Sequence, residues 1–222
     1  TRADLESLPA DRLSTLSRRL ATGPSVLVLA GCWPEQLQDD LSCWQGFNNW
    51  PTDPQQDALD NPQPIREPKR GARIVATALD TEQVVLTLGQ PSCPHGHRDD
   101  LALRLLQSHL GSGMSSLLFQ RLREEHGVAY DVGAYLPARR GAAPFVLHAS
   151  SSADRAELAL TLLLDSWHEL SDRDLTSDEL ELARAKYRGQ VAHASQTASQ
   201  RAERSAQLQG LGLPDDHDQQ CL

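Results

Sequence analysis

The 222-residue chain is predicted to adopt an α+β fold with a mostly antiparallel sheet. The main observation is that short apolar runs typical of strands are mixed with helical patterns, instead of alternating with them one by one. Two pairs of these runs also follow one another through polar turns, as antiparallel neighbours do. A chain of this length can bury roughly 70% of its unfolded surface, so its core needs no disulfide or metal.

Composition excludes several classes of protein. The chain has 21 Lys plus Arg against 30 Asp plus Glu, a formal net charge of -9 that repels a polyphosphate backbone. We therefore expect no nucleic-acid partner. No apolar run approaches the roughly 18 to 20 residues of a membrane-spanning helix, so we expect no membrane span. The four cysteines lack C-x-x-C spacing, which argues against a zinc ribbon or a redox dithiol.

The first 50 residues are predicted to form a helix, a strand and a second helix. Leucines at helical spacing mark one face of the first helix, and Pro9 interrupts it or restarts it. These leucines are Leu5, Leu8, Leu13, Leu16 and Leu20. The apolar run at residues 26–30 reads as a strand buried on both faces. Pro34 suits the first turn of a short helix that extends to about Trp44.

A linker and a second domain follow. Residues 51–70 carry five prolines among Asp, Gln and Asn, a composition that favours an extended connector. Residues 71–222 then form the second domain. Its first two strands are predicted at 74–77 and 84–88, as an antiparallel pair that turns through residues 80–82.

The rest of the second domain combines helices with a second pair of strands. Helices are predicted at residues 99–110 and 115–125, separated by a glycine-containing turn, and strands at 128–136 and 145–150. A strongly apolar helix follows from 153 to 170.

The last helix begins at a recognisable signal. Thr176 and Glu179 form the ends of a capping-box sequence. The helix that it opens is predicted to run, with a bend, to about Leu208.

One loop contains residues that can ligate metals. Cys93, His95 and His97 lie close together between prolines, and thiol and imidazole groups are zinc ligands. There is no fourth ligand at a partner spacing, so we assign no metal to this loop. The remaining histidines show no triad spacing, and G-x-S-x-G is absent. The residues alone give no support for independent catalysis.

The most specific signal is the stretch from Leu105 to Tyr130, L-L-Q-S-H-L-G-S-G-M-S-S-L-L-F-Q-R-L-R-E-E-H-G-V-A-Y. It resembles the second homologous domain of the pitrilysin and mitochondrial-processing-peptidase family of zinc metallopeptidases, the inverzincins. The resemblance spans most of residues 71–212, while residues 1–50 resemble the closing elements of the family's first domain. It implies two similar α+β halves that close like a clamshell, each with helices on one face of its sheet.

The resemblance also implies that this chain is the half without zinc. The family's zinc motif, H-x-x-E-H, lies in the first half, and this sequence has no H-x-x-E-H. We therefore expect zinc in the assembled enzyme and none bound by this segment, which should be inactive alone. The implied partners are an N-terminal zinc-binding half or a partner subunit, and a peptide substrate.

The family's second half is thought to contribute an Arg and a Tyr that reach the substrate near the zinc, and the matching residues here are Arg123 and Tyr130. A guanidinium and a phenol can donate hydrogen bonds to the oxyanion that forms when a peptide carbonyl is attacked. Arg123 would end a helix, Gly127 would take the left-handed cap, and Tyr130 would begin the returning strand. Without the resemblance, a surface arginine and a half-buried strand aromatic would be the favoured explanation of the pair.

Two hypotheses remain about the whole protein. In this family each half finishes with a strand and a helix, so we expect the second domain to be incomplete at Leu222. Residues 1–50 would then dock onto the open sheet edge or pair between two chains in a homodimer. The favoured function is the C-terminal half of a zinc metalloendopeptidase. The alternative is a catalytically inactive relative that serves as a scaffold or partner subunit.

Overall fold

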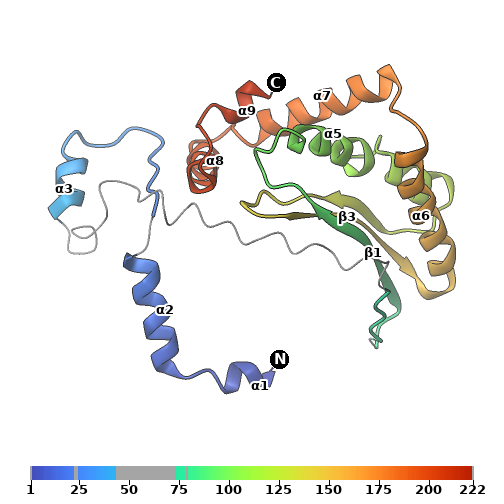
Figure 1. The fold of residues 1–222 in the computed structure, drawn as a ribbon, viewed down its shortest axis with the longest axis horizontal. Coiled ribbons are helices and arrows are strands. Elements are labelled where there is room, and N and C mark those ends of the chain that lie inside the picture. The colour runs from blue at the N-terminus through green and yellow to red at the C-terminus, as the bar shows by residue number, and fades with distance from the viewer. Residues whose placement is uncertain (1, 23–24, 44–73, 79, 222) are drawn as a thin grey trace. The chain divides into compact units, whose positions relative to one another are not determined.

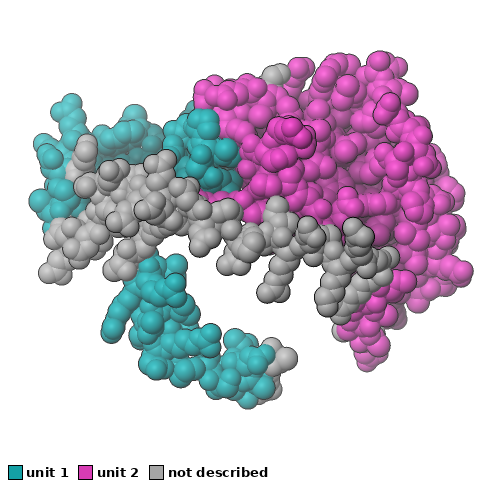
Figure 2. All heavy atoms as spheres, viewed as in Figure 1, with its two compact units in different colours: residues 1–61, 196–215 teal, residues 62–195, 216–222 magenta. Residues whose placement is uncertain are grey.

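The computed structural model describes residues 2–22, 25–43, 74–78 and 80–221. The chain divides into two compact units, coloured separately in Figure 2. Unit 1 comprises Thr1–Asn61 and Gln196–Asp215, and unit 2 comprises Pro62–Ser195 and Asp216–Leu222. The predicted linker at 51–70 lies outside the described residues, so the domain boundaries stay a prediction. None of the described helices is long and apolar enough to cross a bilayer.

The described part of unit 1 is helical. Its helices are α1 (Arg2–Glu6), α2 (Ala10–Thr22), α3 (Leu37–Cys43) and α8 (Ala198–Leu211). The break between α1 and α2 falls at Pro9, as predicted, because proline cannot donate the backbone hydrogen bond that a helix interior needs. Helix α3 confirms the predicted second helix over a shorter range.

The strand predicted at residues 26–30 is wrong. This segment belongs to no helix or strand, and Val26, Leu27 and Leu29 are each more than 40% exposed. An apolar run becomes a strand only when a neighbouring strand satisfies its N–H and C=O groups. No such pairing by this segment is present in the described residues, so its docking onto a sheet edge stays a hypothesis.

The sheet of unit 2 has three antiparallel strands in the order β1-β3-β2. They are β1 (Gln83–Ser92), β2 (Asp131–Tyr135) and β3 (Ala143–Ser152). Strand β1 pairs with β3 over its whole length, from Gln83 opposite Ser152 to Ser92 opposite Ala143. The predicted α+β class with an antiparallel sheet is confirmed, and so are the strands near 84–88, 128–136 and 145–150.

The predicted pairing of 74–77 with 84–88 is wrong. Residues 74–78 form no strand, and Ile74 is 94% exposed. The connecting residues include no Asn-Gly or Asp-Gly pair, which is what favours a tight hairpin turn. Strand β1 instead pairs with a distant segment, β3, with which it shares an apolar face.

Helices lie on one face of this sheet, as expected (Figure 1). The described helices of unit 2 are α5 (Asp100–Gly111), the π-helix η1 (Phe119–Glu125), the short 3-10 helix η2 (Ala153–Arg155), α6 (Ala156–Asp172), α7 (Ser177–His193) and α9 (His217–Gln220). Helices α5 and α6 contact the strands, and α7 packs on α5.

Two capping boxes set the helix boundaries near the end of the chain. At the start of α7, Thr176 accepts from the Glu179 amide while Glu179 accepts from Thr176, which confirms the predicted signal. A second box between Thr197 and Gln200 opens α8. The predicted continuous helix to about Leu208 is therefore two helices, because this second cap starts a new one.

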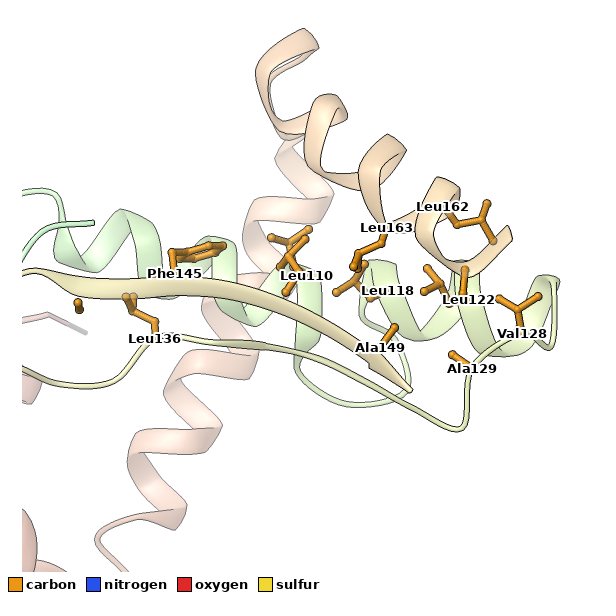
Figure 3. Close-up of a cluster of buried hydrophobic side chains, with 13 residues drawn as sticks. Leu110, Leu118, Leu122, Val128, Ala129, Leu136, Phe145, Ala149, Leu162 and Leu163 are labelled. Atoms are coloured by element: carbon orange, nitrogen blue, oxygen red, sulfur yellow. The ribbon is translucent and has the colours of Figure 1, made fainter. Parts of the chain in front are cut away.

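The core of unit 2 lies between the sheet and the helices (Figure 3). Strand β3 alternates strictly between buried and half-buried residues, the pattern of a strand with one face packed. Its Leu147 meets leucines from α5, η1 and α6, and each fully buried leucine contributes roughly 1.5 to 3 kcal/mol. The fully buried leucines of this cluster are Leu110, Leu118, Leu122, Leu147 and Leu163.

Candidate functional site

Arg123 is carried by an unusual helix. Residues Phe119–Glu125 form a π-helix, in which each turn holds about one residue more than in an α-helix. Such segments are rare and occur frequently at functional sites. The guanidinium of Arg123 lies 5.0 Å from the centre of the Phe119 ring, a cation–π contact that orients it along the helix surface.

The chain turns sharply between this helix and β2. Gly127 has a φ of 60°, which confirms the left-handed conformation expected from its position. The Gly127 carbonyl accepts a hydrogen bond of 2.7 Å from Arg155 Nη1, and the Val128 amide donates to the Leu122 carbonyl at 2.8 Å. These two hydrogen bonds fix the turn to η1 and to Arg155.

Tyr130 lies where the chain joins the sheet. Its amide donates to the Ser150 carbonyl at 2.8 Å, immediately before β2 begins at Asp131. Its side chain is 64% exposed, which is more than a half-buried strand aromatic would be. Arg123 Nη1 donates to the Tyr130 carbonyl at 3.2 Å, so the structure brings the two predicted residues together at the surface.

This arrangement suits hydrogen-bond donation. A guanidinium has five N–H donors, and the bond to Tyr130 orients the group without requiring all of them. The exposed phenol of Tyr130 can donate one further hydrogen bond. Two donors of this kind could bind carbonyl oxygens of a peptide, whereas neither group is suited to act as a general base at neutral pH.

A second cluster of polar side chains surrounds Asp100 at the start of α5. His95 Nδ1 lies 2.7 Å from Asp100 Oδ2, and Arg104 Nε donates to the same oxygen at 3.0 Å. The ring of His217 packs edge-on against that of His95, 5.3 Å between centres. Burial raises the pKa of Asp100, but hydrogen bonds from His95 and Arg104 outweigh it and lower the pKa to about 2.

His95, Asp100 and His217 have the geometry of a metal site but not its electrostatics. Their ligand atoms all lie within 4.8 Å of one another, and His95 and Asp100 are buried. However, Arg104 Nη2 is only 2.6 Å from His95 Nδ1, so a guanidinium already stands beside the ligand atoms. Its charge balances the carboxylate and would repel a metal cation. These residues do not fit a catalytic zinc.

The loop with Cys93, His95 and His97 does not bring these three residues together in the structure. His95 meets Asp100 and His217, and neither Cys93 nor His97 belongs to that cluster. His97 Nδ1 accepts from the Asp99 amide at 3.2 Å instead. Sequence reasoning missed Asp100 and His217 because no local spacing connects His217 with this loop.

Comparisons with known proteins agree with this fold. A family model described as the peptidase M16 inactive domain matches residues 24–187. An uncharacterised zinc protease of Streptomyces coelicolor is 31% identical over 141 residues, covering 60% of this chain and 30% of that protein. An uncharacterised zinc protease of Bacillus subtilis is 25% identical over 141 residues, covering 64% of this chain and 34% of that protein.

Two solved structures share the fold. The peptidase M16 inactive domain from Pseudomonas fluorescens has a TM-score of 0.57 at 21% identity, covering 64% of this chain and 34% of that one. A protease from Helicobacter pylori has a TM-score of 0.58 at 20% identity, covering 64% and 35%. This chain thus spans about a third of the length of the proteins that it resembles. Because the family model matches most of the sequence, the chain belongs to the peptidase M16 inactive-domain family, the C-terminal half of a zinc protease family.

Proposed function

We propose that this chain is the C-terminal half of a zinc-dependent metalloendopeptidase. It encloses a peptide substrate and supplies Arg123 and Tyr130 as donors, while the zinc is bound by an N-terminal half or partner subunit that carries H-x-x-E-H. The observation that carries the proposal is the hydrogen bond from Arg123 Nη1 to the backbone carbonyl of Tyr130, which holds the two exposed residues next to each other. The family membership supports the peptidase class.

The two donors would act after substrate binding. Attack on a peptide carbonyl places negative charge on its oxygen, and fixed donors stabilise that charge better than mobile water does. The contact with Phe119 and the bond to the Tyr130 carbonyl restrict Arg123 before any substrate arrives, and the bond to Ser150 fixes the backbone of Tyr130. Such preorganisation is what a binding site for a transition state requires.

The experiment is to co-express this chain with the H-x-x-E-H half from the same gene or a neighbouring gene. A tryptic digest of casein is the peptide mixture, and cleavage is followed by mass spectrometry with and without zinc. Zinc-dependent cleavage that needs both pieces is the expected result. Absence of cleavage by the wild-type pair would instead favour the scaffold alternative.

The donor roles are tested in that assembled pair. Arg123→Ala and Tyr130→Phe should each lower kcat by roughly one to three orders of magnitude, as loss of an oxyanion donor does. Matched controls are Arg98→Ala, on a side chain that is 87% exposed, and Tyr187→Phe on α7. If kcat/KM were unchanged in both Arg123→Ala and Tyr130→Phe, the proposed roles of Arg123 and Tyr130 as hydrogen-bond donors would be wrong.

A further inference from the structure

The sheet of unit 2 has a second face, opposite the core. Along β3, Phe145, Leu147 and Ala149 are buried among the helices, so the alternate residues point to the other side. We call that side the open face. It carries Val85, Thr87, Val146, His148, Ser150 and Asp131, all half-buried or exposed.

The strand register places polar groups in two rows across the open face. His148 lies between Thr87 of β1 and Gly133 of β2, and the neighbouring row has Val85, Ser150 and Asp131. Directly opposed residues of an antiparallel sheet share a face, so these side chains are neighbours. A histidine, a carboxylate and two hydroxyls therefore meet near the centre of the sheet.

The imidazole of His148 lies over Gly133, on the neighbouring strand β2. A side chain at Gly133 would bring its Cβ within 2.7 Å of His148 Cε1, so the ring occupies the space that glycine leaves. His148 Nε2 lies 3.3 Å from Asp131 Oδ2, within reach of a charge-assisted contact. An ionised carboxylate only accepts hydrogen bonds, so the tautomer that suits this contact has its proton on Nε2, and Nδ1 is then the ring nitrogen that can accept a hydrogen bond.

This pair adjoins the candidate donors. Asp131 directly follows Tyr130, and the Tyr130 amide bonds to Ser150, which stands beside His148 on β3. A peptide that contacts Tyr130 at the start of β2 and then runs across the open face would therefore pass His148. An extended peptide presents backbone N–H groups at regular intervals, and an imidazole Nδ1 can accept one of them.

We propose that His148 is a substrate-binding residue that hydrogen-bonds the backbone of an extended peptide on the open face, with Asp131 as a positioning residue that acts through it. This inference rests on the proposed function and deepens it by adding a binding position. Because the contact is to the backbone, it predicts affinity for unfolded peptides of varied sequence. Nothing in the motif around Arg123 and Tyr130 assigns either residue.

The first test uses the assembled pair and its best-cleaved casein peptide. His148→Ala and His148→Gln should raise KM about 3- to 10-fold with kcat nearly unchanged, the effect of one lost hydrogen bond. Gly133→Ala should do the same, since its methyl group displaces the ring without removing it. Gly189→Ala is the matched control, because a Cβ there meets no atom within 4 Å.

Asp131 needs a test that separates positioning from folding. Asp131→Ala should raise KM, and Asp131→Asn should largely restore it, because an amide oxygen still accepts from Nε2. Unchanged KM in the His148 and Gly133 variants would overturn the inference. So would an equal effect of Gly189→Ala, which would indicate a general loss of structure.

A second test measures peptide binding at His148 directly and does not depend on catalysis. The ring ¹⁵N signals of His148 are followed by NMR in this chain as the casein digest is added, with His97 as internal control. If the His148 signals change in this chain but the wild-type pair cleaves nothing, the inference is retained and the proposed function is rejected. Cleavage by the pair with no change at His148 and no change in KM would retain the function and reject the inference.

Discussion

Asp100 keeps its charge in a site from which water is largely excluded. Its side chain is only 5% exposed, a position at which an unpaired carboxylate would take up a proton. The contacts from His95 and Arg104 make the ionised form the stable one. The cluster therefore fastens the 93–99 loop to α5 through the buried contacts of His95 with Asp100 and Arg104.

This pairing makes stability depend on pH in acid. The pKa of Asp100 falls from 3.8 in the unfolded chain to about 2 in the fold, so its contribution is complete above pH 4 and is lost as the pH falls toward 2. The free energy of unfolding of the wild type should therefore lose roughly 2 kcal/mol relative to Asp100→Asn between pH 5 and pH 2. Urea unfolding at both pH values measures this, with Asp99→Asn as control. A constant difference between wild type and Asp100→Asn would refute the paired carboxylate.

The site residues show what sequence can and cannot predict. Arg123 and Tyr130 were identified through the motif, and the exposure of both and the left-handed Gly127 agree with that prediction. Their roles in substrate binding stay a prediction. The contact of Arg123 with Phe119 depends on the π-helix, which the periodicity of residues 115–125 does not reveal.

At the scale of elements, helix α5 approaches β2 more closely than any side chain would allow. A Cβ on Gly111 would collide with the backbone nitrogen of Ala134. Glycine at this position therefore sets the distance between the helix and the strand that leads on from Tyr130. The atoms that such a Cβ would meet include backbone atoms of β2, which cannot move aside as the end of a flexible side chain can.

Gly111→Ala should consequently destabilise the protein by about 1 to 3 kcal/mol, the usual cost of overpacking. A chain of this size loses roughly 2 to 4 °C of melting temperature for each kcal/mol, so calorimetry should show a clear decrease. Gly189→Ala, in the open surface of α7, should leave the melting temperature unchanged or raise it. Equal melting temperatures for the two variants would contradict the close approach.

Helices were predicted better than strands for a physical reason. The capping box at Thr176 and the break at Pro9 are local signals, and both are found where expected. Strands depend on distant partners, so the apolar runs at 26–30 and 74–77 predicted strands that the described fold does not contain. Strand β1 was located correctly, but its partner was not.

At the scale of the whole molecule, unit 2 depends on one continuous core. Leu163 of α6 is fully buried in the cluster that also contains residues from α5, η1 and β3. Truncating it would leave a cavity that several elements share.

Leu163→Ala should therefore lower the free energy of unfolding by about 2 to 5 kcal/mol, measured by chemical denaturation. Leu182→Ala on α7 is the matched control, because that side chain is 45% exposed and its loss should cost much less. Similar losses in the two variants would show that the cluster does not act as a single core.

The composition of β1 has a practical consequence. From Gln83 to Ser92 this strand contains no charged residue, yet it is one of the two edge strands of the described sheet, the other being β2. Proteins usually protect such strands with lysine or inward-pointing charges, which discourage other chains from adding to them. Only Pro91, near its end, interrupts the row of backbone groups. When the purified chain is concentrated, β1 is the segment of the described sheet at which aggregation would begin.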